Sequence, residues 1–261
     1  MTGGAPARAA YTPPQPGALR FFDWYLTRQF RRHFAGSWWA SATDLAGWDR
    51  TVPTLFVANH TNWWDGFLAY MVMRRAGLRF HILMERVNLD RYRFFYRIGA
   101  LPLDRRAMTA AVRDLEAAIP ALLEGGALMI FPQGARRPAT APLRGLERGA
   151  AHLALRAGRP VRLCAVAFRY AYRGEQLPEA FARIAEPWLL ERADDLDRRA
   201  LTEVIGDRLT SAVAALDADL AAESLGAYTA LVPGRLSVNK RLDRVRHALG
   251  LLEGPFEARN G

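Results

Sequence analysis

TLFVANHTNWWDGFLAYMVMRRAG, residues 54–77, has the pattern of a strand, a polar turn and a helix in succession. The apolar run Thr54–Ala58 is typical of a buried strand, and the apolar spacing over Trp64–Ala76 predicts a helix. Between them His60 stands at the end of the strand, five residues before Asp65. The spacing allows two interpretations: a turn followed by a capped helix, or a base with its orienting acid.

The same alternation of strands and helices continues along the chain. Further strands are predicted at 80–84, 101–103, 127–131, 161–168 and 182–186, and helices at 91–97, 107–124 and 146–157. After Pro187 the pattern becomes helical, with amphipathic stretches at 193–222 and 238–249. We therefore predict one α/β domain with a central mixed, largely parallel sheet flanked by helices. Functional sites in such sheets lie beyond strand ends, where His60 and Pro132 are expected.

Four segments describe the expected organisation of this domain. They are a flexible leader at 1–17, an amphipathic aromatic and basic helical segment at 18–48, the α/β core at 49–190, and a helical extension of the same domain at 191–261. The aromatic and basic segment has two interpretations: a helix packed on its own domain, or an interfacial helix that lies among lipid headgroups. The same two alternatives apply to the basic stretch at 238–249.

Composition limits the class of protein and its partners. The chain has 261 residues, is 51% hydrophobic and carries a formal net charge of +10, which favours an anionic partner. Its single cysteine, Cys164, lies in an apolar strand-like run and excludes an internal disulfide. No run is long enough to cross a bilayer and no signal peptide is evident, so we expect a cytoplasmic protein.

Three further blocks follow the His60 motif in order. They are GALPLDRR at 99–106, FPQGARRP at 131–138 and RPVRLCAVAF at 159–168. With the NH-x4-D motif at 59–65, this series resembles the glycerolipid acyltransferase family, which includes lysophosphatidate and glycerol-3-phosphate acyltransferases. The resemblance covers roughly residues 50–190 and implies a glycerol-3-phosphate acyltransferase-like fold.

The resemblance implies a catalytic pair in the first block. His60 would be the base that takes a proton from an acceptor hydroxyl, and that hydroxyl would then attack an acyl thioester. A neutral imidazole can accept a proton near pH 7, and a carboxylate on its other nitrogen fixes the tautomer. Asp65 would be that carboxylate, with Asn62 as a helix N-cap that brings it near His60. Asn59 completes the motif and is predicted to contact the substrate.

The second and third blocks imply an acceptor-binding site. Arg105 matches the family's phosphate-binding arginine, and a guanidinium suits phosphate oxygens. Gly134 and Arg136 are retained in the third block, but Gln133 stands where the family has glutamate. Glutamine keeps a hydrogen-bonding group and loses the charge, which makes an acceptor other than lysophosphatidate more credible.

The expected function is transfer of a fatty acyl group to a hydroxyl of a lysophospholipid such as 1-acylglycerol-3-phosphate, in phospholipid biosynthesis. The donor would be acyl-CoA or acyl carrier protein, with no cofactor and no metal. Two alternatives stay open: the same chemistry on a glycolipid or glycosylated pigment, and a non-catalytic lipid-binding module. The expected partners are a lipid acceptor, the thioester donor and an anionic membrane surface on the inner face of the cell membrane. The sequence has no recognisable nucleic-acid-binding motif, and we expect no nucleic-acid partner.

Overall fold

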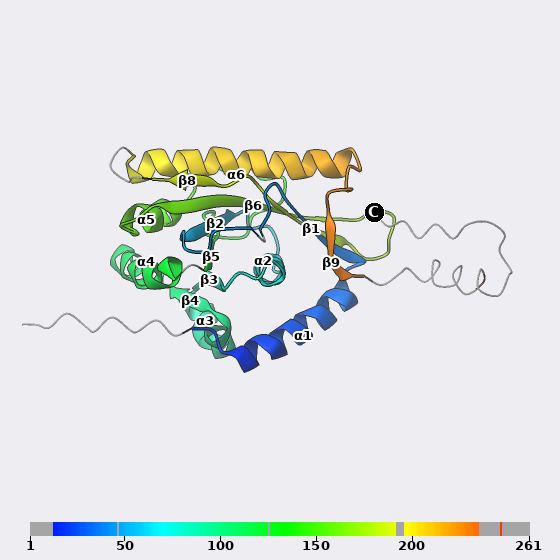
Figure 1. Cartoon of the computed structure of the whole chain (residues 1–261), viewed down its shortest axis with the longest axis horizontal. Coiled ribbons are helices and arrows are strands. Elements are labelled where there is room, and N and C mark those ends of the chain that lie inside the picture. Colours follow the sequence, from blue (N-terminus) through cyan, green and yellow to red (C-terminus); the bar gives the residue numbers. More distant parts are fainter. Residues whose placement is uncertain (1–12, 46, 125, 192–195, 235–245, 247–261) are drawn as a thin grey trace, which may run out of the picture.

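A mixed β-sheet forms the centre of the protein, with helices on both faces (Figure 1). The structure is a computed structural model, and it describes residues 13–45, 47–124, 126–191, 196–234 and 246. Within these residues the strand order is β4-β3-β5-β2-β6-β7-β1-β9, and β8 pairs with β6. The strands are β1 (Gly36–Ser41), β2 (Thr54–Ala58), β3 (Phe80–Glu85), β4 (Ala100–Leu103), β5 (Ala127–Ile130), β6 (Val161–Ala171), β7 (Glu179–Ile184), β8 (Trp188–Leu190) and β9 (Thr229–Pro233).

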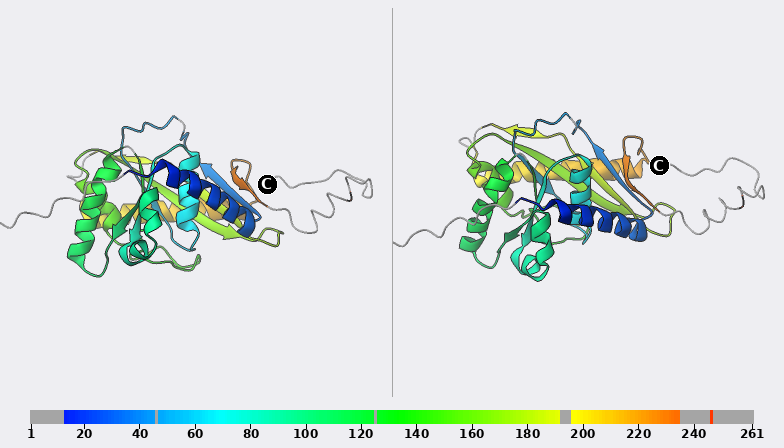
Figure 2. Two further views of the ribbon diagram at one scale, coloured as in Figure 1. Left: turned by 90° about the horizontal axis from the view of Figure 1, so that it is seen from below. Right: turned by 60° about the horizontal axis from the view of Figure 1, so that its bottom comes forward.

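The helices divide between the two faces of this sheet. They are α1 (Pro16–His33), α2 (Asp65–Arg75), α3 (Arg86–Arg91), the 3-10 helix η1 (Arg93–Ile98), α4 (Met108–Leu123), α5 (Gly149–Arg156) and α6 (Arg198–Ala221). Buried side chains of α4, α5 and α6 share one apolar cluster with the sheet, and those of α1 and α2 share another. Figure 2 shows this arrangement from below, with α1 and α2 in front of the sheet and α6 behind it.

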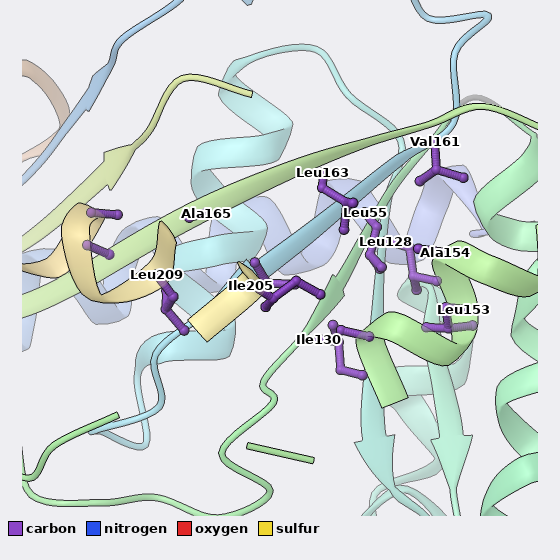
Figure 3. Close-up of a cluster of buried hydrophobic side chains, with 14 of the residues drawn as sticks. Leu55, Leu128, Ile130, Leu153, Ala154, Val161, Leu163, Ala165, Ile205 and Leu209 are labelled. Atoms are coloured by element: carbon purple, nitrogen blue, oxygen red, sulfur yellow. The ribbon is translucent and has the colours of Figure 1, made fainter. Parts of the chain in front are cut away.

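β2 lies at the centre because its side chains are apolar on both faces. It pairs in parallel with β5 and β6, and all five of its residues are buried. Leu55 and Val57 belong to the cluster under α5 and α6, whereas Phe56 and Ala58 belong to the cluster under α1 and α2. Alternate side chains of a strand point to opposite faces, so a continuous apolar run is what a strand covered on both sides requires. Figure 3 shows the first cluster, with Leu55 beside side chains of β5, β6, α5 and α6.

The predicted fold class is confirmed, since the sheet is mixed and largely parallel. The pairs β2–β5, β2–β6, β3–β4, β3–β5 and β1–β7 are parallel, and β6–β7, β6–β8 and β1–β9 are antiparallel. Each predicted strand and helix of the core is present with ends shifted by a few residues. The last predicted strand, 182–186, is observed as β7, which begins three residues earlier and ends two residues earlier, at 179–184.

The helical segment expected at 18–48 is shorter than predicted. α1 ends at His33, and residues 36–41 form strand β1, which pairs with β7 and β9. Pairing with two partners satisfies the backbone of this short segment, and local sequence cannot reveal those partners. The stretch 238–249 and most of the leader lie outside the described residues, apart from single residue 246. Within the described part of the chain, no helix is long and apolar enough to cross a membrane.

Candidate active site

His60 and Asp65 meet at the carboxyl end of β2, where the chain turns into α2. His60 Nδ1 lies 2.9 Å from Asp65 Oδ2. The helix begins at Asp65, and its N-cap is Trp64, two residues after the predicted cap at Asn62. The Asn62 side chain accepts from the Trp64 N–H at 3.2 Å. The short distance between His60 and Asp65 follows from this tight turn, which brings the first helical residue back toward the strand end.

Asp65 is fully buried, and four donors hold its carboxylate. Oδ2 accepts from the backbone N–H groups of Thr61 at 2.6 Å and Asn62 at 2.8 Å, as well as from His60. Oδ1 accepts from the hydroxyl of Tyr170 at 2.8 Å. A buried charge is tolerated only when it is hydrogen-bonded, and the N-terminus of a helix further stabilises a carboxylate.

These contacts assign different roles to the two imidazole nitrogens. Because Nδ1 faces a carboxylate, it carries the proton of the neutral ring, which leaves Nε2 as the basic nitrogen. The imidazole stacks on the ring of Phe131, with centroids 4.3 Å apart and planes at 21°. The His60 side chain is 24% exposed, so part of the ring faces solvent. The arrangement can therefore perform general base catalysis.

The loop at 131–138 holds the backbone of His60 on both sides. The His60 N–H donates to the side-chain oxygen of Gln133 at 2.5 Å, and the His60 carbonyl accepts from the Arg137 N–H at 2.9 Å. The third sequence block thus contacts the first directly. Gln133 therefore lies beside His60, and its side-chain oxygen holds the His60 backbone.

Arg105 reaches the same loop from the end of β4. It donates to the Gly134 carbonyl, and its Nη2 lies 3.0 Å from Glu147 Oε1. Gly134 has a positive φ of 68°, and a Cβ there would lie 2.5 Å from Arg105 Nη2. Glycine at this position therefore permits both the backbone conformation and the approach of the guanidinium.

The other two predicted substrate-binding residues differ in exposure: Asn59 is buried and Arg136 is exposed. Asn59 is 1% exposed, and its amide bonds the backbone of Phe168 through both ends, at 3.1 and 2.7 Å. This position joins the end of β2 to β6, so it suits an anchor rather than the predicted substrate contact. Arg136 is exposed and has no hydrogen-bond or ion-pair partner among the described residues. Its side chain is free to bind an anion.

Three residues of the site were not predicted from the sequence: Tyr170, Phe131 and Glu147. Tyr170 is 105 residues from Asp65 in the chain, and no local spacing signals such a contact. Phe131 is the first residue of the FPQGARRP block, so its place in that block was an available signal. Glu147 comes after the block, and only the fold brings it to Arg105. No cluster of three or more potential metal ligands occurs in the described ranges.

Residues 45–167 match the family described as Acyltransferase. A search of curated protein sequences finds no match. Among solved structures, the fold is similar to that of the 1-acyl-sn-glycerophosphate (LPA) acyltransferase PlsC from Thermotoga maritima, with a TM-score of 0.53 and 15% sequence identity over 76% of this chain and 79% of that chain.

The matched range contains the end of β2, the His60–Asp65 pair and the loop at 131–138. It begins before β2 and extends into β6. Residues 45–167 therefore match an acyltransferase family model, and the fold around them is similar to that of a solved acyltransferase.

Proposed function

We propose that this protein transfers a fatty acyl group from a thioester donor to a hydroxyl of a lysophospholipid such as 1-acylglycerol-3-phosphate. The observation that carries the proposal is the His60–Asp65 pair, at 2.9 Å, at a strand end within the range that matches the acyltransferase family model. The structurally similar PlsC is a 1-acyl-sn-glycerophosphate acyltransferase, and this supports the choice of acceptor. The donor is acyl-CoA or acyl carrier protein, and the reaction requires no cofactor.

The reaction needs one proton shuttle and no acyl-enzyme. His60 Nε2 takes the proton from the acceptor hydroxyl as its oxygen attacks the thioester carbonyl. The tetrahedral intermediate then collapses, the carbon–sulfur bond breaks, and the imidazolium returns the proton to the leaving thiolate. Asp65 stabilises the imidazolium throughout and keeps the ring oriented.

The test is incubation with both thioester donors and a panel of lipid acceptors, with products identified by mass spectrometry. We expect acylated lysophosphatidate from the wild type, and a loss of about 1,000-fold or more in His60→Ala, because the general base is gone. His152→Asn, a change at a histidine of α5, serves as the matched control and keeps its activity. Turnover by His60→Ala at the wild-type rate would contradict the mechanism.

Arg105 decides between a phosphate-bearing acceptor and a neutral one. In the structure its guanidinium is paired with Glu147, which favours as second candidate a neutral acceptor such as a glycolipid. If a phosphate binds here, it competes with the Glu147 carboxylate. Glu147→Gln then lowers the KM for lysophosphatidate about three- to tenfold and leaves that for monoacylglycerol unchanged.

A matched surface pair provides the control for this experiment. Arg79 and Glu124 lie 2.8 Å apart, and both are half exposed. Glu124→Gln should change neither KM. Arg105→Ala should raise the KM for lysophosphatidate only, and equal effects on both acceptors would favour the neutral acceptor.

The protein also works at an anionic membrane surface in this proposal. Phe21, Trp24 and Tyr25 of α1 are exposed, and so is Trp63, which lies in the turn that carries His60. Ring contacts connect the two regions through Phe22 and Phe67: Phe22 stacks with Tyr25 and packs edge-on against Phe67, which packs against Trp63. Aromatic and arginine side chains on one helix suit the lipid headgroup region, and the inner face of the cell membrane is the expected location.

A further inference from the structure

We propose that Tyr170 is a positioning residue for the catalytic pair, because its hydroxyl fixes the carboxylate that orients His60. The Tyr170 hydroxyl donates to Asp65 Oδ1 at 2.8 Å, and the other oxygen of the same carboxylate lies 2.9 Å from His60 Nδ1. The three side chains therefore form a continuous hydrogen-bonded chain from β6 through α2 to the base. The kinetic consequence of this inference rests on the acyl transfer proposed above.

The distribution of donors on Asp65 makes the tyrosine important. Oδ2 has three donors, whereas Tyr170 is the donor that the described residues provide to Oδ1. Asp65 is 0% exposed, so the loss of this hydroxyl leaves a charged oxygen buried without its partner. Without that partner, the Asp65 carboxylate is expected to rotate so that Oδ1 reaches another donor. The rotation would move Oδ2 and disturb its hydrogen bond with His60 Nδ1.

The hydroxyl of Tyr170 is itself well placed and remains a donor. Its ring stacks on Phe34, directly after α1, with centroids 5.8 Å apart and planes at 29°. Ala180 of β7 is its partner in the antiparallel pair with β6. Burial and the neighbouring Asp65 carboxylate raise the pKa of Tyr170 well above its ordinary value, so the phenol keeps its proton at neutral pH.

Tyr170→Phe isolates the hydroxyl, because it retains the ring and its stacking on Phe34. We expect kcat to fall about tenfold with the KM of both substrates unchanged, since the hydroxyl acts through Asp65 and not on the substrate. The second readout is the Nδ1–H proton resonance of His60, which is expected far downfield in an NMR spectrum recorded without substrate. In Tyr170→Phe we expect this resonance to broaden, because the proton exchanges faster with solvent. Its assignment follows from its absence in His60→Ala.

Tyr228 supplies the matched control. Its hydroxyl donates to Asp219 Oδ2 at 2.7 Å, in a tyrosine–aspartate pair outside the catalytic site. Tyr228→Phe should leave both the resonance and kcat as in the wild type. The proposal is overturned if Tyr170→Phe leaves the resonance sharp and kcat unchanged, or if both variants change them equally.

The NMR measurement separates this inference from the proposed function. If the wild type acylates none of the acceptors and the resonance still broadens only in Tyr170→Phe, the proposed function fails and the positioning role of Tyr170 stands. If the wild type is active and the resonance is the same in Tyr170→Phe, the proposed function stands and the positioning role of Tyr170 fails.

Discussion

Gln133 stands where the glycerolipid acyltransferase family, which the sequence resembles, has glutamate, and its neutral side chain still makes a hydrogen bond to His60. Its contact with the site is an oxygen that accepts the backbone N–H of His60 at 2.5 Å. Both an amide and a carboxylate offer such an oxygen, so this contact does not require charge. From the sequence, glutamine in place of glutamate was interpreted as a sign of a different acceptor, but Gln133 contacts the backbone of His60. The choice between a phosphate-bearing and a neutral acceptor therefore depends on Arg105 and Glu147.

Substitutions at Gln133 separate the role of the oxygen from that of the charge. Gln133→Glu keeps the acceptor, and we expect kcat within about threefold of the wild type. Gln133→Leu removes it and leaves the His60 N–H without its partner, so we expect kcat to fall about tenfold. Steady-state kinetics with thermal unfolding as a check on folding would measure this. A Leu variant as active as Glu would show that the contact has no function.

The site residues that sequence could reveal are those that one short segment contains. His60 and Asp65 are five residues apart, and their contact follows from a strand that turns directly into a helix. The contacts of Gln133 and Tyr170 depend on which strands are neighbours. β5 and β6 both pair with β2, and this arrangement, rather than any spacing, brings Gln133 to His60 and Tyr170 to Asp65.

The structure confirms one of the two interpretations of helix α1, a helix packed on its own domain, and contact with lipid headgroups stays a prediction. One side packs on the domain, since Leu26 and Phe30 are each 1% exposed. The other side presents Trp24, 60% exposed, to the surroundings. Helical periodicity predicted both faces, but it could not show that the helix is docked, because docking depends on α2 and on the sheet.

Two alanine substitutions on α1 should have opposite effects. Leu26→Ala deletes a buried side chain and should lower the free energy of unfolding by about 2–5 kcal/mol, with little change in vesicle binding by the folded protein. Trp24→Ala should leave stability within about 0.5 kcal/mol and weaken binding to anionic vesicles severalfold. Urea denaturation and vesicle sedimentation measure the two effects. If Trp24→Ala binds vesicles as the wild type does, α1 is a structural helix only.

At the scale of elements, local sequence patterns did not predict strands β1 and β9. β1, GSWWAS, lies between β7 and β9, and its partners come from residues 179–184 and 229–233. The strand is short, and its two tryptophans fit an aromatic helix equally well. Its conformation is set by pairing with distant segments, which is why the expected helical segment at 18–48 was too long.

At the scale of the whole molecule, the stability of the sheet also depends on polar groups buried within it. His81 in β3 is 0% exposed, and its Nδ1 lies 3.3 Å from the Gly99 carbonyl oxygen. Glycines flank the ring: a Cβ on Gly99 or on Gly126 would lie 3.2 Å from it. Burial, the main cause, lowers the pKa of His81 to about 4 from an ordinary 6.5, because the charged form loses its hydration.

This lowered pKa predicts how the stability of the fold varies with pH. Between about pH 4 and pH 6.5 the unfolded chain binds a proton at His81 that the folded chain does not. The stabilisation is therefore complete above pH 6.5 and decreases as the pH falls toward 4, by up to about 3 kcal/mol. Urea denaturation at several values of pH measures this slope. In His81→Gln, which can still donate to the Gly99 carbonyl but does not titrate, the slope over this range should be smaller by one proton. Equal slopes in the two proteins would show that His81 can be protonated without unfolding.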